Sequence, residues 1–174
     1  SLFMQFKYDE AIPLYEKLIA QGFDNFESNF ILGLCYEDQP DNEKALKHYQ
    51  KAVQFKNDNA TCLFHLALIE KAFNMDSLSM AHFNQSLEVS LPKGRALRTY
   101  KWLAGLHFQH HRYADAARDF ELCTLYDEKD NPLNYYNAAQ MFIASKNKLK
   151  AKLYLQLFLA NANRLEDKKE AAQL

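Results

Sequence analysis

Small and aromatic residues recur along this chain at the spacing of one helical face. The first set is Ala11, Tyr15 and Leu18, at positions i, i+4 and i+7, which lie on one side of an α-helix. Four further sets keep this spacing: Ala45, Tyr49 and Ala52; Ser79, Phe83 and Ser86; Ala116, Phe120 and Cys123; Ala151, Leu155 and Phe158. A small first residue lets two helices approach closely, and the larger residue one turn later fills the space between neighbouring helices. We therefore expect each set to form the packed face of one helix.

The distance between successive sets is nearly constant. The steps from Tyr15 to Tyr49 and on to Phe83 are 34 residues each, and the next two are 37 to Phe120 and 35 to Leu155. Composition alone does not produce such a period, which is typical of stacked structural repeats. The pattern predicts about five repeats with more than ~65% helix and no sheet, well above the helical third of ordinary domains.

A second pattern begins about a dozen residues before each of these sets. It comprises Leu32-Gly33-Leu34-Cys35-Tyr36, then Leu66-Ala67, Leu103-Ala104 and Ala138-Ala139. Here the chain resembles the tetratricopeptide repeat (TPR) family, whose pattern is W-x-x-L-G-x-x-Y followed by A-x-x-x-F-x-x-A. The resemblance covers about residues 1–160, is strongest in the second repeat, and places Asn29, Leu63, Tyr100 and Tyr135 at the Trp site. It implies an all-α fold, a right-handed superhelix (α-solenoid) of antiparallel helix pairs.

The repeats predict one domain over residues 1–174. Its units fall near residues 1–25, 26–59, 60–94, 95–130 and 131–163, and residues 164–174 are expected to form a helix that caps the stack. Leu91-Pro92-Lys93-Gly94 predicts a longer loop between the third and fourth repeats. The first repeat lacks most of its leading helix, so we interpret the chain as a fragment of a longer protein. Leu2, Phe3 and Phe6 would then lie on an uncovered apolar end, through which self-association is an open alternative.

Composition and charge narrow the classes of function. Apolar residues make up 48% and charged residues 25%, which fits a folded chain, and the net charge of −1 argues against nucleic acid as the main partner. No apolar run is long enough for membrane insertion. Cys35, Cys62 and Cys123 are odd in number and lack CxxC spacing, so we expect buried free thiols. Unpaired thiols favour a reducing compartment such as the cytoplasm.

The sequence offers little for catalysis or for cofactor or metal binding. His107, His110 and His111 could place two imidazoles on one helical face, but a packed histidine and two solvated ones fit the repeat better. Lys146, Lys148, Lys150 and Lys152 form a lysine-rich stretch around a turn, either a solvated face or a site for an anionic partner. No glycine-rich phosphate loop or G-x-S-x-G motif is present in the sequence. We predict no catalytic residue, cofactor or metal site, and no enzyme.

The resemblance implies that the first helix of each pair lines a concave groove at positions 2, 5, 9 and 12 of its repeat. The predicted partner-binding residues are Phe30, Phe64, Leu68, Lys71, Arg98, Lys101, Tyr136 and Gln140. Further groove positions are Glu27, Leu34, Glu37, Thr61, Gly105, Phe108, Leu133 and Ile143. Aromatic residues and arginine dominate recognition energy at interfaces. We expect a protein or peptide with an apolar anchor and an acidic group as the partner, held in the groove by an interaction module. The alternative is a structural subunit of a multiprotein assembly.

Overall fold

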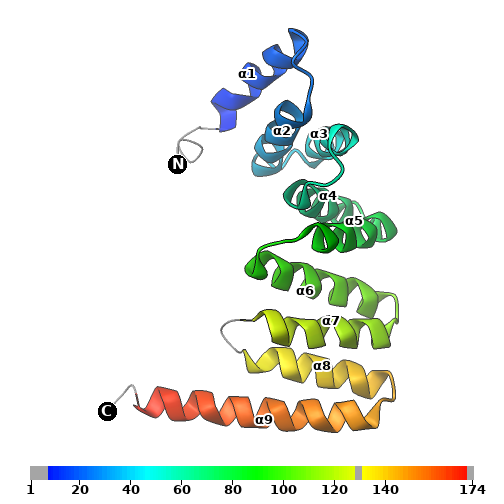
Figure 1. The fold of residues 1–174 in the computed structure, drawn as a ribbon, viewed down its shortest axis with the longest axis vertical. Coiled ribbons are helices and arrows are strands. Elements are labelled where there is room, and N and C mark those ends of the chain that lie inside the picture. The colour runs from blue at the N-terminus through cyan, green and yellow to red at the C-terminus, as the bar shows by residue number, and fades with distance from the viewer. Residues whose placement is uncertain (1–7, 128–130, 172–174) are drawn as a thin grey trace. The chain divides into compact units, whose positions relative to one another are not determined.

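The computed structural model of the chain describes residues 8–127 and 131–171, and all regular structure within these ranges is helical (Figure 1). The predicted all-α solenoid fold is therefore confirmed. The helices group into two compact units, Ser1–Leu91 and Pro92–Leu174. We describe each unit by itself. Leu2, Phe3 and Phe6, on which the expectation of an uncovered end rests, lie outside the described residues.

The first unit contains α1 (Tyr8–Ala20) and two helix pairs. The pairs are α2 (Phe26–Asp38) with α3 (Asn42–Phe55), and α4 (Ala60–Ala72) with α5 (Asp76–Val89). Side chains begin three of these helices: Asn25, Asp41 and Asn59 each accept a hydrogen bond from the backbone N–H three residues later. Such caps satisfy amide groups that have no partner inside the helix.

The second unit contains two further pairs, α6 (Lys93–Gln109) with α7 (Tyr113–Tyr126), and α8 (Pro132–Ala144) with α9 (Lys148–Ala171). The predicted longer loop before the fourth repeat is wrong. The extra residues belong to α6, which has 17 residues where α2, α4 and α8 have 13. Pro92 precedes α6 as its N-cap residue, so Lys93 and Gly94 already lie in the first helical turn. Residues 164–171 are helical as expected, as the continuation of α9.

The packed face predicted from the repeated small and aromatic residues is present in the pairs. Ala45, Ser79 and Ala116 are 0% exposed, and so are the aromatic residues Tyr49 and Phe83. The buried hydroxyl of Ser79 donates a hydrogen bond to the Ala67 carbonyl at 2.8 Å. A polar residue can therefore lie between the two helices without leaving a buried hydroxyl unpaired. The small residues thus determine how closely the two helices of a pair approach.

Gly33 shows how close this approach is. A Cβ atom at this position would lie 2.5 Å from the Tyr49 ring. Any side chain larger than hydrogen would have to push the ring away, because carbon atoms do not approach to that distance without repulsion. The aromatic ring of α3 therefore occupies the space that glycine leaves open on α2.

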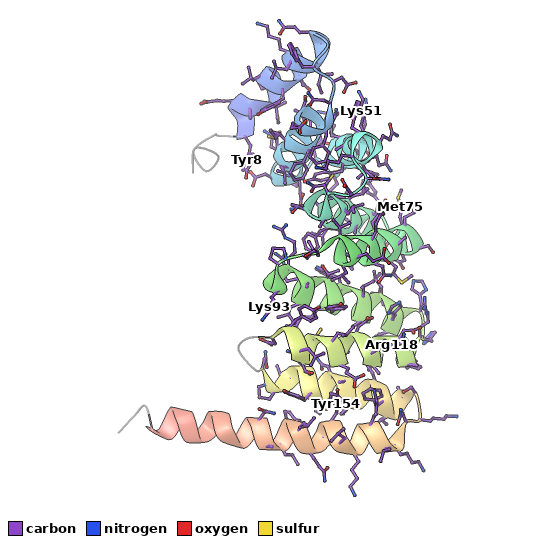
Figure 2. The ribbon with its side chains drawn as sticks, in the orientation of Figure 1. Tyr8, Lys51, Met75, Lys93, Arg118 and Tyr154 are labelled. Carbon is purple, nitrogen blue, oxygen red and sulfur yellow. The ribbon has the colours of Figure 1, made fainter. Side chains whose placement is uncertain are left out.

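A second contact joins the two helices of every pair through residues that are 12 positions apart. In α2–α3 it is a ring stack between Tyr36 and His48, with centroids 5.6 Å apart, and in α8–α9 Phe142 meets Tyr154 at 5.3 Å. Tyr154, labelled in Figure 2, also donates from its hydroxyl to Glu121 of α7 at 2.8 Å. Aromatic rings thus occupy these two positions in the first pair, α2–α3, and in the last pair, α8–α9.

The two middle pairs have a histidine and a carboxylate at these positions. His82 Nδ1 lies 2.8 Å from Glu70 Oε2, and His107 Nδ1 lies 2.6 Å from Asp119 Oδ2. The order is inverted between them, since the carboxylate is on the first helix in one pair and on the second helix in the other. Burial raises the pKa of Asp119 to about 6, although the hydrogen bond with His107 opposes the shift.

The cysteines are free and buried, as expected. Cys35, Cys62 and Cys123 are at most 1% exposed. Burial raises the pKa of Cys62 and of Cys123 to about 12, which keeps these thiols protonated near neutral pH. They fill small-residue positions between helices.

We predict that Phe83→Ala lowers the free energy of unfolding by about 3–5 kcal/mol, the usual cost of truncating a buried aromatic residue. Phe83 is fully buried and its ring centroid lies 5.9 Å from that of Phe64. Urea unfolding followed by circular dichroism measures the change. Phe55→Ala is the control, because Phe55 is 50% exposed. A loss below about 1 kcal/mol for Phe83→Ala would show that this ring does not support the seam.

We also predict that the stability difference between the wild type and Asp119→Asn depends on pH. The folded carboxyl, with a pKa of about 6, retains a proton that the unfolded carboxyl releases near pH 4. The stability of the wild type relative to the variant should therefore fall as the pH rises from about 4 to about 6, and then level off. Urea titrations across this range test the prediction, which fails if the difference is independent of pH.

Candidate partner-binding surface

The predicted groove positions of α8 form a solvent-exposed apolar row. Leu133, Tyr136, Gln140 and Ile143 follow one another at intervals of three or four residues and so share one helical face. Leu133 is 58%, Tyr136 39% and Ile143 50% exposed. The Tyr136 ring rests on Phe158 of α9 with centroids 5.3 Å apart, which holds it in place while its other side faces solvent. Tyr136 and Gln140, the two predicted binding residues here, are thus placed on one accessible face.

A second row, on α6, combines positive charge with aromatic residues. Arg98, Lys101 and Phe108 are exposed, and they share a face with Gly105. Trp102 lies on the same side of the helix, one turn from Arg98, and is 38% exposed. We did not predict Trp102 as a binding residue, because it is not at one of the four groove positions; its large apolar side chain next to Lys101 was the available signal. The sequence of α6 contains four lysine and arginine residues and no acidic residue.

Gly105 lies in the middle of this row with no neighbour to explain it. A Cβ atom at this position would meet no heavy atom within 4 Å, in contrast to Gly33. Glycine in a helix interior costs roughly 0.5–1 kcal/mol relative to alanine. Packing within the chain therefore gives no reason for glycine here, whereas a partner that approaches the backbone of α6 would.

The first unit presents its predicted groove positions less openly. Phe30 is half-buried, and its ring lies 5.5 Å from that of Phe26 and 6.2 Å from that of Tyr49. Leu68 and Lys71 of α4 are also half-buried. Part of the surface of each of these three side chains, Phe30, Leu68 and Lys71, is therefore accessible to a partner, and the rest is buried.

The prediction that Phe64 contacts a partner is contradicted. Its side chain is 1% exposed and packs against Phe83 of α5 and, edge-on, against the neighbouring His65. Leu63, which the repeat pattern places at the Trp site, is buried as well. Helix α4 is therefore buried on more than one face, unlike a helix with a single apolar stripe. Truncation of Phe64 would therefore act on stability.

Glu37 illustrates a groove position with a structural role. It accepts hydrogen bonds from the Tyr49 hydroxyl of α3 and lies 2.9 Å from His65 Nδ1 of α4. One carboxylate thereby connects three successive helices. Burial, followed by the hydrogen bond to Glu37, raises the pKa of Tyr49, so this phenol keeps its proton for the contact.

An apolar depression of about 270 Å³ lies between α1 and α2. Its lining includes Tyr8, Leu14 and Ile31, together with the groove position Leu34. Tyr8 and Leu14 are 43% and 48% exposed. The depression has no charged side chain in its lining and therefore offers shape and apolar surface alone.

The histidines that could have formed a metal site are used differently. His107 pairs with Asp119, and His111 Nδ1 lies 2.9 Å from the Tyr113 hydroxyl. Within the described ranges, no group of three or more His, Cys, Asp or Glu side chains is arranged to hold a metal ion. Nor is any described helix long and apolar enough to cross a membrane.

Comparison with known protein families and curated proteins gives two matches. The model of the anaphase-promoting complex, cyclosome, subunit 3 family matches residues 4–76. A curated relative, DnaJ homolog subfamily C member 3 of Gallus gallus, is 24% identical over 188 residues, which cover 98% of this chain. The chain spans 37% of the length of that relative.

Solved structures with the same fold cover nearly the whole chain. MamA superposes with a TM-score of 0.75 at 17% identity, over 96% of this chain and 87% of its own. YrrB, described as a TPR protein with an unusual peptide-binding site, gives 0.71 at 15% identity, over 97% and 84%. Naa15/Naa10 bound to HypK-THB gives 0.70 at 13% identity, over 91% and 23%. The chain therefore has the tetratricopeptide-repeat fold, as its sequence pattern predicts, and arrays of this type generally form protein-interaction modules.

Proposed function

We propose that this chain is a non-enzymatic interaction module that binds a polypeptide segment along the first helices of its pairs. The observation that supports this most directly is the pair of exposed rows on α6 and α8. Both rows consist of positions that the repeat pattern assigns to the groove, and they carry Arg98, Lys101, Phe108, Leu133, Tyr136 and Ile143 on the surface.

The chemistry of the two rows suggests what the partner carries. An aromatic or aliphatic anchor fits against Tyr136, which buries a large area at a small cost in side-chain entropy. A carboxylate fits Arg98 and Lys101, whose row contains no acidic side chain. The gap at Gly105 lets the main chain of the partner pass close to α6. In the first unit, Phe30, Leu68 and Lys71 are the corresponding candidate binding residues.

A structural subunit of a larger assembly is the second candidate. The matched family model is that of a subunit of the anaphase-promoting complex, and the Naa15 structure contains several proteins. Sedimentation of the purified chain separates the two functions: a monomer that binds short peptides supports the module, and a stable oligomer supports assembly.

The binding prediction concerns a peptide selected from a random library on the immobilised protein. Tyr136→Ala and Phe30→Ala should each weaken its binding by about 1–3 kcal/mol, the scale of interface anchors. Lys101→Glu should mainly slow association and reduce the salt dependence, because an exposed charge steers more than it holds. Lys47→Glu, an exposed charge reversal on α3, is the control. Calorimetry at two salt concentrations measures all four. If only the control loses binding, the partner uses the second helices instead.

Gly105→Leu provides a sharper test of the row on α6. The Cβ atom of the new side chain would meet no heavy atom within 4 Å, and leucine favours a helix more than glycine does, so the free energy of unfolding should be unchanged or higher. It fills the gap between Lys101 and Phe108, so affinity for the selected peptide should fall at least about tenfold, or 1.4 kcal/mol. Ala81→Leu, at an exposed position of α5, is the matched control. Unchanged affinity in Gly105→Leu would place the peptide elsewhere.

A further inference from the structure

The last helix pair has an open apolar depression that shares only Ile143 with the predicted groove positions. It has a volume of about 470 Å³ and lies along α9 from Lys148 to Leu159. Its floor consists of Ile143 of α8 with Ala151, Leu155 and Leu159 of α9. Leu159 is 58% exposed, so part of this floor faces solvent directly. Figure 2 shows side chains that project from the face of α9 pointing away from α8.

Three lysines surround the floor. Lys146, Lys148 and Lys152 belong to the lining, and none of the described lining residues is acidic. All three are exposed, and none has an ion pair within the described part of the chain. The lysine-rich stretch noted in the sequence thus divides into two groups with different roles.

Lys150, the fourth lysine of the stretch, forms an ion pair with a residue of α7. Its Nζ lies 2.9 Å from Glu121 Oε2 and 5.1 Å from the centroid of the Phe142 ring. Burial disfavours ionisation of Glu121, but the hydrogen bonds from Lys150 and Tyr154 outweigh it and hold its pKa below the usual value. One lysine therefore stabilises the α7–α9 contact, and the other three leave their charge at the edge of the depression.

Lys146 occupies a backbone position that suits lysine poorly. It ends the turn between α8 and α9 with φ of 61°, and the corresponding turns after α4 and α6 have Asn74 and His111 at φ of 57°. Glycine and asparagine adopt this left-handed conformation most readily. Lysine lacks the short polar side chain by which asparagine can form a local hydrogen bond in this conformation. A lysine here serves to place a charge at the rim.

The depression has the dimensions of a helix-binding surface. Twelve residues of helix, from Lys148 to Leu159, extend over roughly 16 Å, or about three turns. Positions 148, 152, 155 and 159 are spaced by four, three and four residues, so they form one row along α9, with the lysines in its first half and the leucines in its second half. The small side chain of Ala151 between them leaves room for a side chain from an opposing helix.

We propose that this face of α9 binds an amphipathic helix of a partner protein, with an apolar row against Leu155 and Leu159 and carboxylates beside Lys148 and Lys152. The excess of lysine at the rim and the lack of acidic residues in the lining select the charge of this partner. The concave floor fits projecting side chains of a helix better than the flat surface of an anionic bilayer.

The test uses a stapled helical peptide of about three turns, because short unconstrained helices are marginal in water. Its leucines are spaced at i, i+4 and i+7, and glutamates flank them. A second peptide has lysines in place of the glutamates. Fluorescence anisotropy measures the binding of both to the whole chain at low and at physiological salt. The acidic peptide should bind at least tenfold more tightly than the basic one, with affinity that decreases as salt increases.

Variants of the chain locate the site. Two variants should each weaken binding of the acidic peptide at least tenfold: Leu159→Ser, and the double change Lys148→Glu with Lys152→Glu. Both variants alter exposed residues only. Lys47→Glu should have no effect. Lys101→Glu and Gly105→Leu, which test the row on α6, should also leave this binding intact, so failure here is distinguishable from failure of the proposed function. Circular dichroism of each variant verifies that it is folded.

Several results would overturn the proposal. Equal binding of the two peptides, or binding that is insensitive to Leu159→Ser, would show that this face does not select an acidic helix. Sedimentation that reveals a dimer which Leu159→Ser dissociates would assign the face to a second copy of the chain. Binding to anionic vesicles that both variants abolish, without binding of the peptide, would assign it to a membrane surface.

Discussion

The close approach of two helices within each pair is the constraint on which the other features of this structure depend. Gly33 leaves room for the Tyr49 ring, and Ala45 and Ala116 leave room for the backbone of the facing helix. Once the helices are this close, their remaining contacts have fixed positions, and residues 12 apart must meet. Because repeats of this kind contact mainly their neighbours, stability is distributed as a series of such pairwise contacts.

The same geometry accommodates quite different chemistry. The positions 12 residues apart hold stacked rings in α2–α3, a histidine–carboxylate pair in α4–α5, the inverted pair in α6–α7 and rings again in α8–α9. A buried charge is costly unless it is paired and hydrogen-bonded. Substitution at one of these positions therefore constrains the other, and a repeat can diverge in sequence while it keeps the shape. This explains why the consensus is incomplete in three of the repeats although the helices are regular.

The helices and the seam were predictable because a period of about 34 residues, with a helical face inside it, leaves few alternative folds. The exposed residues were harder to predict than the helices, because an error of one residue in the helical register rotates a side chain by about 100° around the helix axis. Phe64 was predicted at the surface and is buried, because α4 is apolar on two sides. The different role of Lys150 within the lysine-rich stretch could not be predicted from sequence, because its ion-pair partner Glu121 lies on another helix, 29 residues earlier in the chain. The extra residues of α6 gave no signal beyond Pro92, which starts that helix.

Residues that the fold does not need are the strongest guide to function in a repeat protein. Glycine at position 105 destabilises its helix, and lysine at position 146 adopts an unfavourable backbone conformation. Among the described residues, we find no side-chain contact that explains either choice. Exposed leucine at position 159 likewise contributes little to the core. Each of these residues lies beside lysine or arginine. Their common property is a cationic, apolar surface in a chain whose net charge is −1, and this concentration of positive charge at two places is the reason why we propose acidic groups on the partner.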